Sequence, residues 1–407
     1  MLNILSSNLA QNLRFCKSRG LQFSVQWCKF VKNEPKQPMK RSYTEIESRE
    51  ALQPLMIEGT CLTHYAFQAI RFDDAAACCR YEDCLFIGCR IPDAMRPMIG
   101  AGCYEFPELP MPFRVFPPQL YSADSLYLGY DPTDERTFES CYDTQVYRHY
   151  INHGKRASCI RETLARYLHD HSISDALHDL LDKYNERQPV AIMGGHALSR
   201  VDSAYRSIAR ISKRLAEAGC LMMSGGGPGA MEATHLGAWF AGRTNDELME
   251  AVDYLAMAPT YKDAGWLASA FRVMRRYPRV SEVCSIGIPT WFYGHEPATP
   301  FATHIAKYFE NSIREDGLLA LAKGGVIYAP GSAGTMQEIF QDGAQNHYET
   351  FGFSSPMVFL GRDYWTRQLP VYPLLEELVD AGKYRNLLLS ITDEEEMVVE
   401  TILNFVF

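Results

Sequence analysis

The chain has 407 residues, of which 47% are hydrophobic and 22% are charged, and its formal net charge is −9. This length exceeds that of a typical single domain, so we expect at least two domains with a substantial hydrophobic core. The negative charge argues against a general nucleic-acid-binding surface. No apolar run is long enough to cross a membrane.

The first 33 residues are basic and contain no acidic residue; the basic residues are Arg14, Lys17, Arg19, Lys29 and Lys32. Such a composition resembles a mitochondrial presequence, which would cover residues 1–38. The alternative is an over-extended start with Met39 as the true initiator and a cytoplasmic protein, and we favour this second interpretation. In both cases we expect residues 1–48 to be disordered or absent from the working protein.

Residues 49–170 are predicted to form an N-terminal accessory domain. The stretch 50–165 holds eight of the twelve cysteines and many aromatic residues. Cysteines 78, 79, 84 and 89 lack the paired CxxC spacing of a zinc site, so we interpret them as buried free thiols. The domain could serve regulation or oligomerisation, or could simply extend the core that follows.

A group of polar residues precedes the second domain, namely His169, His171, Asp175, His178 and Asp179. These residue types could bind a metal ion. Their segment reads as a helix, however, and we interpret them as an exposed polar face. We therefore predict no metal site.

Residues 171–407 alternate short apolar runs with amphipathic helical stretches, which is typical of a Rossmann-like parallel sheet flanked by helices. The fold class is therefore α/β with an additional N-terminal domain. The expected strands cover residues 189–195, 219–224, 283–290, 325–330 and 356–361. In such sheets ligands bind at the carboxyl ends of the strands.

A glycine-containing turn, Pro330-Gly331-Ser332-Ala333-Gly334-Thr335, follows the expected strand that ends at Ala329 and leads into a helix that contains Glu338. The first amides of a helix lack internal partners and carry the positive end of the helix dipole, so they can bind a phosphate. The glycines let the backbone approach the ligand closely. We therefore predict an anion site with an adjacent carboxylate.

A second turn of this kind, Ser224-Gly225-Gly226-Gly227-Pro228-Gly229, follows the expected strand at 219–224 and leads into Ala230-Met231-Glu232. Its spacing fails the dinucleotide fingerprint, because no acidic residue stands at the end of a second strand in the expected way. We do not predict NAD.

Four segments together resemble the Lonely Guy-type nucleotide phosphoribohydrolases, which are often mislabelled lysine decarboxylases. They are Val190–Gly195, GGGPGAMEA at 225–233, Ile286–Pro289 and PGSAGTMQE at 330–338. The resemblance extends from about Pro189 to the C-terminus. The larger bacterial nucleoside 5′-monophosphate nucleosidases of that family also carry extra segments around the core, and the chain resembles this type in its length, without a residue-by-residue match of the N-terminal region. Ser332 and Ala333 depart from the usual motif, which bears on substrate detail.

The resemblance implies hydrolysis of the N-glycosidic bond of a nucleoside 5′-monophosphate to free base and ribose 5-phosphate, without metal or organic cofactor. It implies Glu338 and Arg314 as the catalytic pair, where Arg314 is matched by its spacing. It also implies a homodimer or larger homo-oligomer. The residues expected to bind substrate and phosphate are Gly225, Gly226, Gly227, Gly229, Glu232, Gly331, Ser332, Ala333, Gly334 and Thr335.

The segment at about 242–282 is longer than a crossover needs and includes Tyr261, Lys262, Trp266, Arg272, Arg275, Arg276 and Arg279. A lid over the site and a solvated basic helix face are both compatible with it.

Two other functions are alternatives to hydrolysis. A non-catalytic nucleotide or molybdenum-cofactor carrier of the same fold would not need Arg314 and Glu338. A pyridoxal phosphate decarboxylase would need a lysine at a phosphate turn. Lys323, however, precedes its strand and is expected at the opposite end of the sheet.

Overall fold

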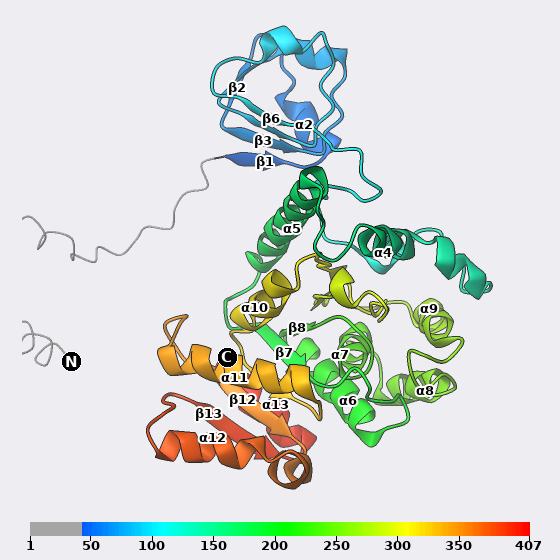
Figure 1. Cartoon of the computed structure of the whole chain (residues 1–407), viewed down its shortest axis with the longest axis vertical. Coiled ribbons are helices and arrows are strands. Elements are labelled where there is room, and N and C mark those ends of the chain that lie inside the picture. The colour runs from blue at the N-terminus through cyan, green and yellow to red at the C-terminus, as the bar shows by residue number, and fades with distance from the viewer. Residues whose placement is uncertain (1–42) are drawn as a thin grey trace, which may run out of the picture. The chain divides into compact units, whose positions relative to one another are not determined.

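The computed structural model describes residues 43–407, and residues from Glu45 to Phe407 form one compact unit (Figure 1). The predicted presequence or extended start therefore lies outside the described residues up to residue 42. Thr44–Ile46, which fell within the stretch expected to be disordered, form strand β1. Among the described residues, no helix combines the length and the apolar character needed to cross a bilayer.

The N-terminal part, blue and cyan in Figure 1, is a short parallel β-solenoid. One sheet has the order β1-β3-β5-β6 and the other pairs β2 with β4. Ala66 pairs with Leu85 and Leu85 with Tyr104, so each coil repeats after about 19 residues. The strands are β2 (Cys61–Thr63), β3 (Tyr65–Gln68), β4 (Arg80–Glu82), β5 (Leu85–Ile87) and β6 (Tyr104–Phe106).

The solenoid has its own core of stacked aromatic rings. Phe67 and Phe86, which occupy equivalent positions in successive coils, stack with ring centroids 5.3 Å apart. Cys79 and Cys84 are buried in the same core, and Cys78 and Cys89 are partly buried beside it. All four thiols are free, so these cysteines fill the interior of the solenoid.

A seven-stranded parallel sheet forms the larger part of the described chain, with the order β10-β9-β8-β7-β11-β12-β13. The strands are β7 (Pro189–Met193), β8 (Leu221–Ser224), β9 (Ser285–Gly287), β10 (His304–Ile305), β11 (Val326–Tyr328), β12 (Pro356–Leu360) and β13 (Leu388–Thr392). The predicted α/β fold is confirmed, and the five expected strands are present. Strands β10 and β13 were not predicted.

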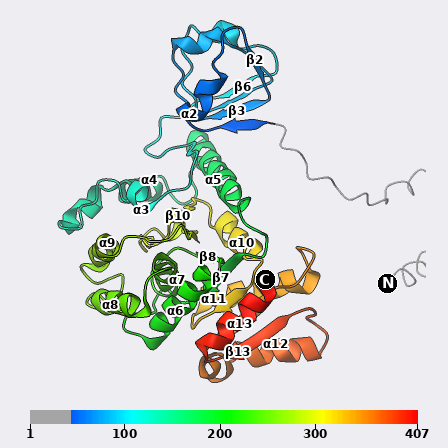
Figure 2. The same cartoon turned by 180° about the vertical axis from the view of Figure 1, so that it is seen from behind.

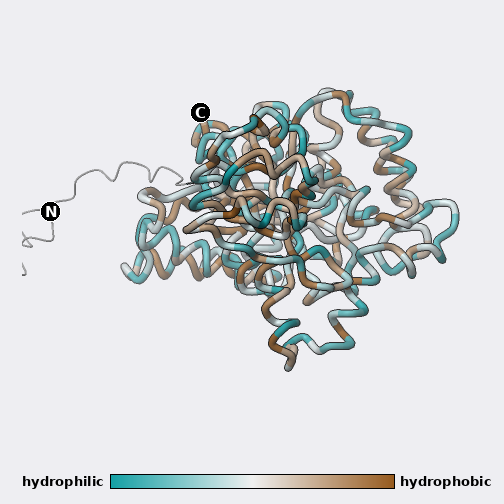
Figure 3. Tube along the Cα trace, turned by 90° about the horizontal axis from the view of Figure 1, so that it is seen from above, coloured by the Kyte–Doolittle hydropathy of each residue, from teal (hydrophilic) through white to brown (hydrophobic). Residues whose placement is uncertain are grey.

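Helices cover both faces of this sheet because its strands are buried on both sides. Alternate strand residues enter two separate cores: Ala191 and Met193 enter one, and Val190 and Ile192 the other. Figures 1 and 2 show α11 and α13 on opposite faces, and Figure 3 shows hydrophobic segments running through the middle. The helices are α6 (Ser203–Glu217), α7 (Ala230–Trp239), α8 (Asn245–Leu255), α9 (Trp266–Arg276), α10 (Asn311–Leu321), α11 (Ala333–Tyr348), α12 (Val371–Asp380) and α13 (Glu395–Val406).

The boundary expected at residue 170 falls inside a continuous helix, α5 (Ile160–Leu181). Phe113 and Val146, from the expected accessory domain, share one hydrophobic core with Met193 of the sheet. Helices α3 (Ala123–Leu126) and α4 (Tyr142–Asn152) belong to this same region. The separate N-terminal core contains residues 46–95, so the region expected to form one accessory domain contributes to two hydrophobic cores.

The polar group on α5 is not a uniformly exposed face. His171 and His178 are exposed, but His169 is wholly buried between the hydroxyl of Tyr121 and the carboxylate of Asp170, each 2.9 Å away. Asp170 in turn accepts hydrogen bonds from the amides of Phe309 and Glu310 at the start of α10. The prediction of an exposed face is therefore wrong for His169.

Candidate functional site

The turns that follow β7, β8 and β11 meet at the carboxyl edge of the sheet. The amide of Gly195 donates to the carbonyl of Pro330 at 3.0 Å, and the amide of Ala230 donates to the carbonyl of Gly195 at 3.2 Å. A β-carbon on Gly229 would lie 2.8 Å from the carbonyl oxygen of His196, so only glycine permits this approach. The strand order reverses between β7 and β11, which is where such sheets bind ligands.

The two glycine turns differ in accessibility. Ser332, Ala333 and Gly334 are exposed at the N-terminus of α11, and a β-carbon on Gly334 would meet no atom within 4 Å. Gly229 and Ala230, at the N-terminus of α7, are buried. The open helix N-terminus at α11 can therefore accept an anion, whereas the N-terminus of α7 is enclosed by protein.

The turn at α11 is held by side chains on its inner side. Thr335 is buried, and its hydroxyl lies against Gly331 where a β-carbon would otherwise stand. The hydroxyl of Tyr364 donates to the carbonyl of Gly331 at 2.5 Å. These contacts leave the outward side of the turn to solvent.

Gly225 makes room for Arg314, and Gly226 allows a close approach to the strand beside it. Nε of Arg314 donates to the carbonyl of Ile288 at 2.9 Å, and a β-carbon on Gly225 would collide with Nη2 of Arg314. Gly226 has φ 71°, and a β-carbon there would lie 2.9 Å from the amide nitrogen of Ile288. This turn therefore forms the wall against which the guanidinium of Arg314 is held.

Arg314 and Glu338, the expected catalytic pair, come from α10 and α11 and act on each other electrostatically. Glu338 is partly buried. Burial raises the pKa of its carboxyl to about 7, Arg314 opposes the rise, and the negative charge of Glu315 adds to it. A carboxyl with this pKa can exchange a proton near neutral pH.

Glu232 does not line the site in the way the sequence suggested. Its carboxylate is wholly buried, accepts from Arg200 Nη2 at 2.6 Å and accepts from the hydroxyl of Tyr205 at 2.9 Å. Arg200 also donates to the carbonyl of Trp266 and to the hydroxyl of Ser269 in α9. The ion pair of Arg200 and Glu232 therefore links α9 to α7, and the carboxylate of Glu232 is occupied by these hydrogen bonds.

His196 and Glu296 at this edge were not predicted, and a third side chain, Tyr261, comes from the segment that was named as a possible lid. Glu296 lies 3.9 Å from the position of a β-carbon on Gly227, and His196 Nδ1 is 3.8 Å from its carboxylate. The rings of His196 and Tyr261 are 6.3 Å apart. The sequence position of His196 could have identified it as a site residue, because it directly follows the turn Gly194-Gly195.

A buried hydrogen-bonded chain supports the turn at Gly226. The hydroxyl of Ser224 accepts from the amide of Gly226 at 3.1 Å and lies 2.8 Å from Nε2 of His235. Nδ1 of His235 lies 3.0 Å from the hydroxyl of Ser285. Burial lowers the pKa of His235 to about 3, so the ring is neutral and can both donate and accept.

The segment 242–282 is built into the fold, since Leu248 and Val252 of α8 and Val273 of α9 enter one of the sheet cores. Lys323 precedes β11 and pairs with Glu186 at 3.5 Å. It therefore stands at the amino end of that strand, opposite the glycine turns.

Elsewhere among the described residues, oxygens of Glu45, Glu47 and Asp179 approach within 4.8 Å of one another. Partly exposed acidic groups of this kind are common without an ion.

Comparison with known proteins gives structural likeness only. No protein-family model matches the chain, and no curated protein is significantly similar to it. A molybdenum cofactor binding protein from Rippkaea orientalis has 16% sequence identity and a TM-score of 0.33; the match covers 55% of this chain and 100% of that one. The molybdenum cofactor carrier protein from Chlamydomonas reinhardtii has 14% identity and a TM-score of 0.33, covering 54% of this chain and 99% of that one. Likeness at this level carries no argument about activity.

Proposed function

We propose that this protein hydrolyses the N-glycosidic bond of nucleoside 5′-monophosphates. The observation that carries the proposal is the carboxyl of Glu338 in α11, near the open N-terminus of that helix, whose pKa is raised by burial and lowered by the charge of Arg314. The four segments that resemble the Lonely Guy-type phosphoribohydrolases lie in and around this edge of the sheet.

The 5′-phosphate would bind the exposed amides at Ser332, Ala333 and Gly334, where the helix dipole favours negative charge. Arg314 would hold the phosphate or the departing base as a permanently charged donor. No metal or organic cofactor takes part in this scheme.

Glu338 would act on the ribose carbon that carries the base. The bond between C1′ and the base nitrogen breaks, and its electron pair leaves with the base, which takes up a proton from solvent. The ribose then carries positive charge, which the carboxylate of Glu338 stabilises. Glu338 also orients a water molecule, and the oxygen of this water bonds to C1′. Glu338 accepts the proton that the water releases, and the product is ribose 5-phosphate.

The competing function is a nucleotide or cofactor carrier of the same fold. The raised pKa of the Glu338 carboxyl beside a permanently charged arginine supports the hydrolase over a carrier, because a carboxyl that exchanges a proton near neutral pH serves proton transfer. We therefore favour the hydrolase.

The test is incubation of the full chain with AMP, GMP, IMP, CMP and UMP, followed by chromatography of free base and ribose 5-phosphate. Nucleosides and lysine serve as controls. Release of base from monophosphates alone is the expected result. Nucleotide binding without release of base would overturn the hydrolase and favour the carrier.

A further inference from the structure

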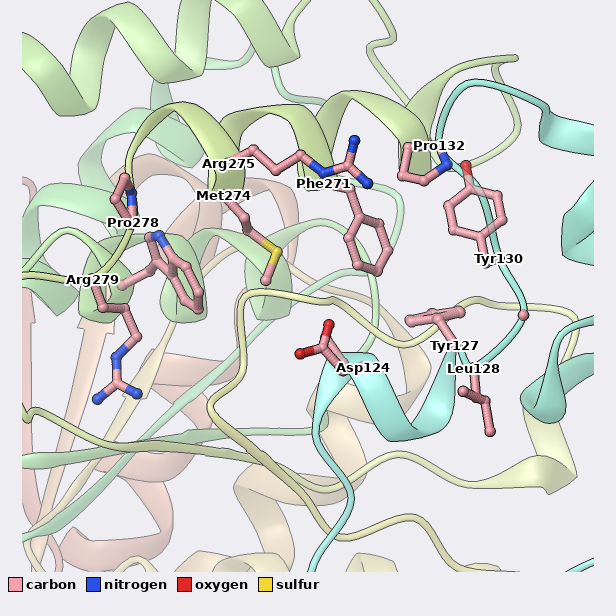
Figure 4. A pocket seen from close by; sticks show the side chains of 13 residues that line it. Asp124, Tyr127, Leu128, Tyr130, Pro132, Phe271, Met274, Arg275, Pro278 and Arg279 are labelled. Atoms are coloured by element: carbon pink, nitrogen blue, oxygen red, sulfur yellow. The ribbon is translucent and has the colours of Figure 1, made fainter.

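A separate cavity of about 460 Å³ lies between residues 123–132 and helix α9 (Figure 4). Its volume is in the range of small-molecule sites. None of the residues assigned above to phosphate binding or catalysis lines it.

Aromatic and thioether side chains form much of its wall. The rings of Tyr127 and Phe271 meet edge to face with centroids 5.7 Å apart, and Tyr130 lies 5.5 Å from Phe271. Trp239 and Met274 complete this wall. Such a surface favours a planar aromatic ligand, because ring contacts add to the burial of apolar area.

Charged side chains of both signs border the same space. In Figure 4 the carboxylate of Asp124 faces the ring of Phe271 across the cavity, and Arg275 extends along α9 above that ring. Asp124 is in no salt bridge with another described residue. Arg279 is committed, since it donates to the carbonyls of Ser281 and Val283. Asp124 and Arg275 are both exposed, and the charge of Arg275 also acts on the carboxyl of Asp131. The rim of the cavity therefore offers an acceptor in Asp124 and a cation in Arg275.

A chain of contacts connects this cavity with the turn that holds Arg314. The hydroxyl of Tyr127 donates to the carbonyl of Ala298 at 2.5 Å. The next residue, Thr299, donates from its amide to the carbonyl of Gly226 at 2.9 Å. Gly226 stands beside Gly225, over which the guanidinium of Arg314 lies.

We propose that this cavity is an effector site for a planar aromatic ligand that carries both an amino group and an anionic group. The ring packs against Phe271 and Trp239, the amino group donates to Asp124, and the anion pairs with Arg275. The occupied cavity then fixes Tyr127 and, through Ala298 and Thr299, the turn at Gly226. Two classes of molecule share this chemistry: nucleotides with an amino-bearing base, and aromatic amino acids.

Binding of matched ligand pairs to the full chain tests the site by calorimetry. CDP against UDP, and ADP against IDP, differ by an amino group on the base; tryptophan against indole-3-propionate differs by the ammonium group. We expect the amino-bearing member of one class to bind about tenfold more tightly, as a charge-assisted hydrogen bond allows. The responding class identifies the source of the ligand.

Single substitutions assign the binding to this cavity. Asp124→Asn should remove the difference within each pair, and Arg275→Gln should weaken binding about tenfold. Arg276→Gln is the matched control, because Arg276 is the next residue on α9 but pairs with Glu250. Equal affinity within every pair, or an effect of Arg276→Gln as large as that of Arg275→Gln, would overturn the proposal.

Hydrogen exchange of the backbone at residues 224–229 tests the coupling, and it does so whether or not the protein hydrolyses nucleotides. We expect the ligand to slow exchange there in the wild type. Tyr127→Phe keeps the ring but loses the hydrogen bond to Ala298, so it should retain binding and lose the slowing. Unchanged slowing in Tyr127→Phe would show that this route does not couple the two sites.

Discussion

Arg314 donates from Nε to the carbonyl oxygen of Ile288 at 2.9 Å, and this bond fixes its guanidinium over Gly225. The carbonyl belongs to the residue that follows β9, so the end of a strand positions a side chain from α10. The positive charge held there lowers the pKa of Glu338, which burial raises.

Glu338→Gln should reduce the rate of base release by two to four orders of magnitude, roughly the contribution of a positioned acid or base. Nucleotide binding should persist, because glutamine keeps the size of the side chain. The measurement is kcat from chromatographed base, with binding followed by calorimetry. Normal turnover in this variant would exclude the assigned role.

The pH dependence of hydrolysis should follow the ionisation of Glu338. The scheme needs its carboxylate form, so the rate should rise with pH through about 7. Glu315→Gln removes a negative charge that raises this pKa, so the rising limb should move to lower pH. Asp316→Asn, one residue further along α10, is the control. If the rate rises over the same pH range in Glu315→Gln as in the wild type, the pH dependence does not report the ionisation of Glu338.

Glu232→Gln should destabilise the fold by about 3–5 kcal/mol, because it leaves the buried guanidinium of Arg200 without its counter-charge. Tyr205→Phe removes one hydrogen bond to the same carboxylate and should cost only about 1 kcal/mol. Urea denaturation measures both. A Glu232→Gln variant with wild-type stability and weakened nucleotide binding would restore the role in phosphate binding that the sequence suggested.

Gly334→Ala should leave the fold intact, since its β-carbon would meet no atom within 4 Å. It should nevertheless raise KM for nucleotides about tenfold, because the added methyl group occupies the open side of the α11 N-terminus where the phosphate is placed. Gly317→Ala in α10 is equally open and serves as the control with unchanged KM. Equal KM values in both variants would move the phosphate away from this turn.

Stability should fall as pH rises from about 4 to about 7 through Asp342. Burial raises the pKa of this carboxyl from 3.8 to about 7, while its hydrogen bond from Tyr328 opposes the rise. Between these values the folded state holds a proton that the unfolded state has released, so a higher pH favours unfolding. The difference is on the order of 4 kcal/mol, from 1.36 kcal/mol per pKa unit.

Asp342→Asn removes this titration. Its melting temperature relative to the wild type should therefore be higher at pH 8 than at pH 4. The same difference in melting temperature at both pH values would show that Asp342 does not titrate in this range.

Local patterns in the sequence were sufficient for five of the seven strands of the parallel sheet and for the two glycine turns. Buried parallel strands are short apolar runs, and a turn that approaches other backbone closely needs glycine; both properties belong to a few neighbouring residues. The expected strand at 325–330 and the turn from Pro330 therefore stand where the sequence placed them. The pair Arg314 and Glu338 was predicted from the resemblance in motif spacing, since its two helices are brought together only by the fold.

Tertiary packing decided what the local patterns left open. Both glycine turns look alike in sequence, but only the N-terminus of α11 is exposed, because Gly195 and His196 enclose that of α7. The sequence places Glu232 in the first turn of a helix, but it does not identify Arg200 as the partner of its carboxylate, because the two residues are brought together only by the fold. The cavity at Phe271 likewise depends on contacts between distant segments, for which a single sequence carries no local signal.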